Sequence, residues 1–305
     1  MGDKKEIESY LKYYLISDEA KRIINASPII NPEGFGLWSF KKLIFLEYYL
    51  KPYLQISENQ GCTCIYLDLF SSSGANRISE KNLCSIGSPI ISLLKGVIYN
   101  AKRDSNNRFK KWFFLDSNQE FCKALEERTI ETTKIIEESL KEKLEIGKDI
   151  EIIHGDCNKN LPKILERIKK EFEGEKLSIL CFIDPYTFTN IEWNTWEELL
   201  KLRYIDIIFT FPINTIKRGF DQCREVEKFL PPELIQIKKQ KKFSEISDED
   251  FGKCYAKEIC KRIFRTVNYF DKGVSVRNSS NGELYRIEFF SASPMAIKIA
   301  LGIGK

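Results

Sequence analysis

The pattern of apolar and polar positions predicts alternating strands and helices through the middle of the chain. Short apolar, β-branched runs predict strands over 62–70, 111–115, 150–153, 177–183 and 206–211. Apolar residues at helical spacing predict helices over 88–99, 118–144, 161–172 and 193–202. Four of the strands lack polar alternation, which is typical of a sheet covered by helices on both faces. The sequence therefore predicts an α/β fold with a doubly wound, mostly parallel sheet.

The segments before and after this alternating region predict helices at the N-terminal end and an antiparallel strand at the C-terminal end. Helices are expected over 7–16 and 40–53, with Ser39 as a cap, and a loop over 25–36, which carries two prolines and two glycines. Beyond residue 211 we expect helices over 221–230 and 248–267, then strands over 273–277 and 284–290 around a turn-rich linker at 278–282. We expect residues 1–60 to form an N-terminal helical cap and residues 61–305 the α/β domain, in one compact unit.

Composition narrows the class of protein. The chain has 305 residues, 43% of them hydrophobic and 30% charged, which suits a large core and disfavours general disorder. The net charge of +4 permits a nucleic-acid partner without favouring one, and the basic cluster at Lys238–Lys242 is read as a solvated loop or as a phosphate contact.

The nine cysteines are scattered and form no C-x-x-C pair, which predicts buried thiols in a reducing compartment and no metal site. Residues 1–10 are charged and lack an apolar signal core, and no apolar run reaches the ~18 residues that span a bilayer. We therefore expect a cytoplasmic protein that does not enter a membrane.

The first candidate site segment follows the strand expected over 62–70. Glycine and serine at such a position let backbone N–H groups approach a ligand closely. The segment is typical of the loop that wraps the methionine part of S-adenosylmethionine, and an ordinary strand-to-helix turn is the alternative. Its candidate cofactor-binding residues are Asp68, Phe70, Ser71, Ser72 and Gly74.

Two further candidates follow the next strands. Asp116, with Ser117 beside it, ends the strand at 111–115, where a carboxylate can accept both hydroxyls of a ribose or cap the next helix. Asp156, followed by Cys157, ends the strand at 150–153 and is placed to bind the exocyclic amine of adenine. The only histidine, His154, is read as a strand-end residue, because no nucleophile elbow accompanies it.

The candidate catalytic residues Asp184, Pro185 and Tyr186 follow the strand at 177–183. An acidic strand end followed by proline and an aromatic residue is the arrangement of amino-methyltransferases. There, a side-chain oxygen and the proline carbonyl accept hydrogen bonds from the target amino group, and the ring stacks on a flat substrate such as a flipped base. The alternative is a turn in which Pro185 and Tyr186 are only structural.

Together these motifs resemble the three-Cys-motif partner protein family. The resemblance spans nearly the whole chain from Trp38 and rests on segments 38–43, 48–50, 66–70, 87–89, 113–116, 154–156, 182–185 and 209–212. It implies a Rossmann-like methyltransferase fold, S-adenosylmethionine as cofactor, and a separate partner protein that bears three cysteines.

The chain departs from the motifs of these proteins in two places. Ser72 stands where the first glycine of the loop motif D-x-F-x-G-x-G is usual, and a positive φ at Ser72 would cost roughly 1–2 kcal/mol. One proline of the motif D-P-P-aromatic is missing at Asp184–Tyr186, and no C-terminal winged-helix extension is evident.

The residues predict a methyltransferase that uses S-adenosylmethionine and acts on an amino group, such as that of a nucleic-acid base. One alternative is a non-catalytic Rossmann-like subunit for a three-Cys-motif protein, with Ser72 as a sign of lost chemistry. A dehydrogenase is disfavoured because the sequence lacks G-x-G-x-x-G and contains Asp-Pro-Tyr.

Overall fold

The central feature of the protein, in a computed structural model, is a sheet of seven strands. The structure describes residues 17–35, 39–78, 83–100, 105–212, 225–240, 248–262, 274–277 and 283–303. The strand order is β11 (Val274–Arg277), β12 (Glu283–Ser291), β10 (Ile205–Phe211), β9 (Leu177–Ile183), β2 (Thr63–Asp68), β7 (Lys111–Asp116) and β8 (Ile150–His154).

Strand pairing confirms the predicted fold class. β2 pairs in parallel with both β7 and β9, and β7 pairs in parallel with β8. β12 is antiparallel to both β10 and β11. Numbered along the chain, the sheet strands stand in the order 3-2-1-4-5-7-6, a Rossmann-like sheet of the methyltransferase type whose last strand in the chain is antiparallel.

The chain divides into two compact units. Unit 1 comprises Met1–Asp156, Gly174–Phe182 and Gly302–Lys305, and unit 2 comprises Cys157–Glu173 and Ile183–Leu301. Residues 1–60, the predicted helical cap, belong to unit 1, and their status as a separate domain stays a prediction.

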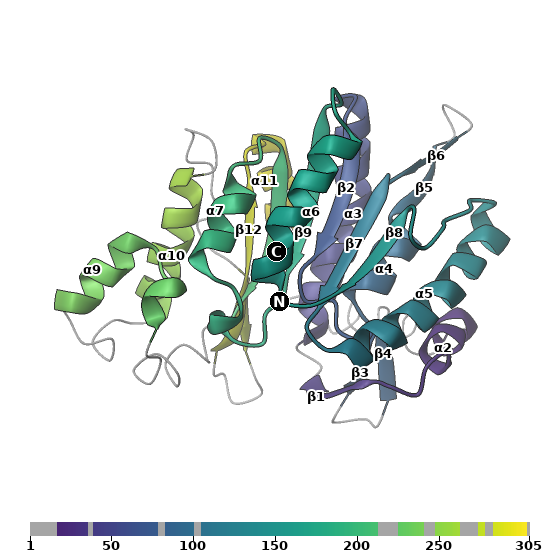
Figure 1. Ribbon diagram of the computed structural model, residues 1–305, viewed down its shortest axis with the longest axis horizontal. Helices are drawn as coiled ribbons and strands as arrows, with labels where there is room; N and C mark the ends of the chain where they lie inside the picture. The colour runs from purple at the N-terminus through teal and green to yellow at the C-terminus, as the bar shows by residue number, and fades with distance from the viewer. Residues whose placement is uncertain are drawn as a thin grey trace. The chain divides into compact units, whose positions relative to one another are not determined.

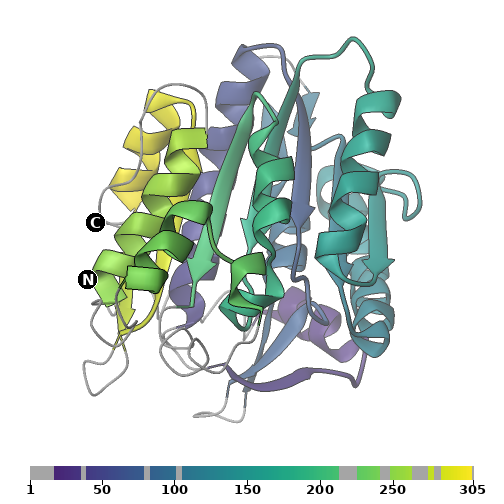
Figure 2. The ribbon, with the colours of Figure 1, turned by 60° about the vertical axis from the view of Figure 1, so that its left-hand side comes forward.

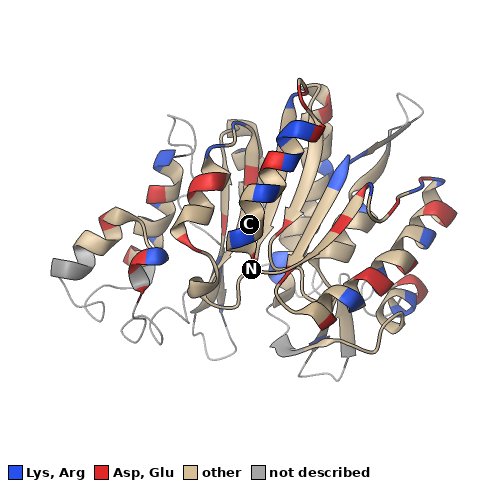
Figure 3. Cartoon of the chain, in the orientation of Figure 1, with Lys and Arg blue, Asp and Glu red and all other residues tan. Residues whose placement is uncertain are grey.

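Unit 1 has four helices among its described residues; three pack against β2, β7 and β8, and the first of the four packs against the last (Figure 1). They are α2 (Asp18–Asn25), α3 (Phe40–Asn59), α4 (Ser88–Lys95) and α5 (Gln119–Leu140). The α3 stripe of Leu43, Leu46, Tyr49 and Leu50 is buried, as its spacing predicts. Asn118 is the N-cap of α5, and its side chain accepts hydrogen bonds from Glu120 N and Phe121 N. Acidic and basic residues are interspersed along α5 (Figure 3).

Unit 2 is built around an aromatic core. Trp196 is fully buried, and its ring packs edge-on at 4.9 Å from Phe209 and 6.2 Å from Phe290. Helix α10 lies next to α7 in Figures 1 and 2. The helices that contribute to this unit are α6 (Cys157–Glu171), α7 (Trp193–Leu200), α9 (Pro232–Gln240), α10 (Asp248–Arg262) and α11 (Pro294–Ile303), with 3₁₀ turns η3 (Phe188–Asn190) and η4 (Val226–Lys228).

Two expectations about local structure are wrong and one strand pair was not predicted, because these segments form strands that pair with other strands. The predicted loop at 25–36 contains β1 (Asn31–Phe35), which pairs in parallel with β3 (Ala75–Ile78); β1 is an edge strand, where a proline is tolerated. The sequence did not predict the antiparallel pairing of β3 with β4 (Leu83–Ile86). The helix expected to reach residue 99 ends at Lys95, because Val97–Asn100 (β5) pairs with Ser105–Arg108 (β6).

Smaller differences concern element ends. Ser39 precedes α3 without a capping hydrogen bond from its side chain, and Gly87, not Ser88, is the N-cap of α4. The sequence did not predict α9 or α11. The helix predicted over 7–16, the linker at 278–282 and parts of the helices predicted over 221–230 and 248–267 lie outside the described residues. No helix in the described ranges has both the length and the apolar character to cross a bilayer.

Candidate functional site

The carboxyl ends of β2, β7 and β8 bring candidate residues of unit 1 to one edge of the sheet. Asp68 is the Cα partner of Phe114 on one side and of Phe182 on the other. Asp116 is the Cα partner of His154. The direction of strand order reverses between β2 and β9, and in open α/β sheets ligands bind at this switch point.

The loop after β2 is fixed by hydrogen bonds to both neighbouring strands. Leu69 N donates to Phe182 O at 3.1 Å, and Ser71 N donates to Leu115 O at 2.8 Å. Asp68 is fully buried, and its Oδ1 accepts a hydrogen bond from Phe70 N at 3.3 Å. The structure thus shows Asp68 supporting the loop backbone, and its contact with a cofactor stays a prediction.

Ser72 adopts the left-handed conformation that its position in the motif calls for. Its φ is 53°, and its backbone N–H donates to Asp116 Oδ2 at 2.8 Å. Gly74 has a φ of 75°, and a Cβ at that position would lie 2.8 Å from Leu125 Cδ1. The loop therefore keeps a glycine-like path at Ser72, at a cost of about 1–2 kcal/mol.

Asp116 joins the loop to β7. Its Oδ2 accepts from Ser72 N, and its Oδ1 accepts from Asn118 N at 2.8 Å. Burial raises the pKa of Asp116, while the two backbone hydrogen bonds and the charge of His154 oppose this rise. An ionised carboxylate has about four acceptor sites, so about two remain for ligand hydroxyls at this half-buried position.

The other two strand-end candidates of unit 1 are exposed. Ser117 follows β7, and its carbonyl oxygen lies 3.0 Å from His154 Nε2. Asp156 follows β8 after Gly155, whose N–H donates to Asp116 O at 2.8 Å. Strand register thus brings Asp116, Ser117 and His154 together, and Asp156 follows His154 by two residues, directly before α6.

Cys157 belongs to unit 2 and is 4% exposed. Its thiol donates a long hydrogen bond of 3.8 Å to Asn190 O. In the structure Cys157 contacts the turn after Tyr186, and its contact with a cofactor stays a prediction.

The Asp184–Tyr186 turn of unit 2 presents an exposed ring. Asp184 is half-buried, Pro185 is buried, and Tyr186 is 71% exposed. Burial, with a smaller contribution from the charge of Asp184, raises the pKa of Tyr285 well above its ordinary value. An exposed tyrosine beside a buried proline leaves the ring face available for stacking.

Sequence reasoning missed Asn158, which fixes the segment after this turn. Its Nδ2 donates to Asn190 O at 3.0 Å, and its Oδ1 accepts from Glu192 N at 2.8 Å and from Thr195 Oγ1 at 2.6 Å. Nothing in the sequence marks this residue, because its partners lie more than thirty positions away.

Sequence reasoning also missed Arg128, a fully buried arginine on α5. Here a signal was present, because position 128 falls on the buried stripe that contains Leu125 and Thr132, where a charged side chain is unexpected. Within the described part of the chain, no group of three or more His, Cys, Asp or Glu residues is arranged to hold a metal ion.

Comparison with known proteins finds structural neighbours but no family. No protein-family model matches the sequence, and no curated protein matches it. Among solved structures, the protein LPL1258 from Legionella pneumophila aligns with a TM-score of 0.37 at 14% identity, over 59% of this chain and 70% of that one. The methyltransferase domain of bacterial CtHen1-C aligns with a TM-score of 0.35 at 10% identity, over 81% of this chain and 98% of that one. The assignment to a Rossmann-like fold of the methyltransferase type therefore rests on strand order and direction.

Proposed function

We propose that this protein is a methyltransferase that uses S-adenosylmethionine and acts on an amino group, with a nucleic-acid base as the acceptor class. The observation that carries the proposal is the left-handed Ser72, whose N–H is bound by Asp116 at the carboxyl end of the neighbouring strand. A loop that holds this conformation against steric cost is expected at a functional site.

The residues of unit 1 suit the cofactor. Asp116 retains acceptor sites for ribose hydroxyls, and the loop from Ser71 to Gly74 presents backbone at the switch point of the sheet. Ser72 Oγ is buried without a hydrogen-bond partner among the described residues. We assign Ser117 and Asp156 to the adenosine end, as the sequence predicts, whereas the role of Cys157, which belongs to unit 2, stays a prediction from the sequence alone. When bound, S-adenosylmethionine supplies an electrophilic methyl group on its sulfonium.

The residues of unit 2 suit a flat acceptor. In the proposal, Asp184 and the Pro185 carbonyl accept hydrogen bonds from the target amino group, and Tyr186 stacks on its ring. Hydrogen bonding of this kind would direct the nitrogen lone pair toward the methyl group, and the thioether S-adenosylhomocysteine would leave as the N–C bond forms. The methylated nitrogen is acidic enough to release its proton to water, so that a strong general base is not required. The 71% exposure of Tyr186 supports the stacking role.

The cofactor assignment is tested by isothermal titration with S-adenosylmethionine and S-adenosylhomocysteine. We expect micromolar binding by the wild type and at least tenfold weaker binding by Asp116→Ala. Glu120→Ala is the matched control, since Glu120 is an exposed acid on the first turn of α5 and its side chain pairs with Lys123. An equal loss of cofactor affinity in Asp116→Ala and Glu120→Ala, or no cofactor binding by the folded wild type, would refute the cofactor site.

The acceptor assignment is tested by transfer of a labelled methyl group to nucleic acids and to polypeptides. Tyr186→Ala should lower transfer to the acceptor without changing cofactor affinity, because the ring is exposed. Tyr48→Ala, which removes another exposed aromatic ring (49% exposed), is the control. Normal transfer by Tyr186→Ala would exclude the stacking role.

A non-catalytic subunit for a three-Cys-motif protein is the second candidate, and Ser72 in place of glycine is the observation that favours it. This candidate predicts no cofactor binding by the folded chain alone and capture of a cysteine-bearing partner. Transfer assays should therefore be run with and without that partner protein.

A further inference from the structure

Arg128 is the most unusual charged residue in unit 1. Its side chain is fully buried, and its hydrogen bonds within the described part of the chain end on backbone carbonyls. Nη1 donates to Ser73 O at 2.7 Å, while Nη2 donates to Ser27 O at 2.7 Å and to Ile24 O at 3.3 Å. The guanidinium therefore connects the loop between β2 and β3 (residues 69–74), the candidate cofactor loop, to the carboxyl end of α2.

The side chain stays charged in this position. Burial lowers the pKa of Arg128 to about 10, which still leaves the guanidinium protonated at neutral pH. A buried cation is costly unless hydrogen bonds replace its hydration, and carbonyls at the end of a helix carry a partial negative charge. The arrangement thus requires the loop and α2 to remain close to α5.

The Ser73 carbonyl is the contact that matters for the cofactor loop. It belongs to the peptide between Ser73 and Gly74, and the residues at positions 72 and 74 have φ values of 53° and 75°. Ser73 is also held by its hydroxyl, which donates to Ala75 O at 2.9 Å and accepts from Asn31 N at 3.2 Å. A strained backbone persists only where several contacts fix it together.

We propose that Arg128 is a positioning residue of the cofactor site: by binding the Ser73 carbonyl, it holds the loop in the left-handed path that Ser72 disfavours. The loop geometry then depends on the end of α2, because the same guanidinium binds Ile24 and Ser27. The link to cofactor affinity rests on the proposed function, whereas the effect on the loop does not.

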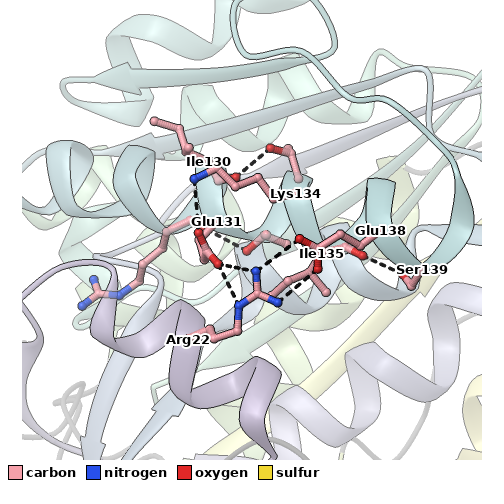
Figure 4. Close-up of polar contacts among 10 residues, drawn as sticks. Arg22, Ile130, Glu131, Lys134, Ile135, Glu138 and Ser139 are labelled. Atoms are coloured by element: carbon pink, nitrogen blue, oxygen red, sulfur yellow. Dashed lines mark hydrogen bonds and ion pairs between the residues drawn. The ribbon is translucent and has the colours of Figure 1, made fainter.

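If Arg128 only stabilised the packing of α2 against α5, its substitution would have the same effect as weakening that packing elsewhere. Arg22 on α2 also stabilises this packing, because it binds two acidic residues of α5 (Figure 4). Its Nε lies 3.0 Å from Glu131 Oε1, and its Nη1 lies 3.1 Å from Glu138 Oε2. Arg22→Ala weakens the contact between α2 and α5 without touching the loop, and it is the matched control.

The first measurement is hydrogen exchange of residues 69–78 without ligand. Arg128→Lys keeps the charge but loses the forked geometry, so we expect at least tenfold faster exchange there, and no change in Arg22→Ala. Adding Ser72→Gly to Arg128→Lys should return exchange toward the wild-type rate, because glycine removes the strain that Arg128 opposes. Unchanged exchange in Arg128→Lys, or equal changes in both arginine variants, would overturn the proposal.

The second measurement is titration of the same variants with S-adenosylhomocysteine. We expect Arg128→Lys to bind at least tenfold more weakly, Arg22→Ala to bind normally, and the double variant to recover part of the loss. If the wild type does not bind but exchange responds as expected, the proposed cofactor is wrong and the positioning of the loop by Arg128 stands. Normal binding by Arg128→Lys would refute its role at the site.

If Arg128→Lys does not fold, the NMR signals of the arginine guanidinium groups in the wild-type protein provide the test instead. Buried guanidinium protons exchange slowly, so the Nη1–H resonance of Arg128 should be observable by NMR. Addition of S-adenosylhomocysteine should shift this signal and leave that of Arg22 unchanged. No shift at Arg128 on saturation would refute the proposal.

Discussion

Gly74 provides a direct test of how tightly the candidate cofactor loop is packed. A Cβ at this position would lie 2.8 Å from Leu125 Cδ1 and 3.3 Å from Ile90 Cγ1, and the φ of 75° is unfavourable for alanine. The backbone strain costs about 1 kcal/mol. Overpacking against buried Leu125 adds roughly 1–3 kcal/mol. Gly74→Ala should therefore lower the free energy of unfolding by about 2–4 kcal/mol.

Gly61 is the matched control for this variant. Its φ is 67°, close to that of Gly74, but a Cβ there meets nothing within 4 Å. Gly61→Ala should thus cost only the backbone strain, about 1 kcal/mol. Urea unfolding followed by tryptophan fluorescence measures both variants, and Leu125→Ala in each background tests the contact. We expect the combination of Gly74→Ala with Leu125→Ala to be less destabilised than the sum of the two.

A steric clash at Gly74 is refuted if the two glycine variants lose the same free energy of unfolding within about 0.5 kcal/mol, the usual accuracy of additive comparisons. That result would mean that the loop yields freely to a Cβ and that Leu125 does not constrain it. Cofactor affinity provides a second readout, since a loop displaced by the clash should bind S-adenosylhomocysteine more weakly in Gly74→Ala than in Gly61→Ala.

Three further predictions concern single side chains. Burial raises the pKa of Asp116 in the folded protein, so the stability that this group contributes is full below the ordinary aspartate pKa of about 3.9 and is lost as pH rises through the raised value. Between about pH 3 and 6, the free energy of unfolding of the wild type should therefore fall relative to that of Asp116→Asn as the pH rises. A difference between the two proteins that stays constant with pH would contradict this. Asn158→Ala removes hydrogen bonds to Asn190 O and Glu192 N in the segment after Tyr186, and one to Thr195 Oγ1 in α7. It should lower the free energy of unfolding by about 1–3 kcal/mol and speed hydrogen exchange at residues 187–192. Exposed Lys159→Ala should change neither. Burial raises the pKa of the Cys64 thiol to about 12. Mass spectrometry after brief iodoacetamide treatment should therefore find half-buried Cys62 labelled before Cys64, which should remain unlabelled. Equal labelling of the two cysteines would refute the burial of Cys64.

The apolar pattern of the sequence determined the core of the fold. Runs such as 177–183 and 206–211 lack polar alternation because helices cover both faces, and this signal is local enough to be read from one chain. The positions of Asp68 and Asp116 at strand ends followed from the same pattern, since parallel strands present their carboxyl ends at one edge. The cost of a positive φ at Ser72 also followed from residue type, because only a side chain with a Cβ meets that penalty.

Only the tertiary structure decided which distant groups meet. A segment with two prolines and two glycines was read as a loop, yet Asn31–Phe35 pairs with Ala75–Ile78, because hydrogen bonds between strands depend on a partner that local propensity does not encode. Arg128 falls on an apolar stripe, but its partners come from 101, 104 and 55 positions away. Asn158 likewise looks like an ordinary polar residue until the fold brings Asn190 and Glu192 to it. Hydrophobic periodicity records burial along one element, whereas a polar contact requires two groups at a fixed distance and angle, which folding of the whole chain provides.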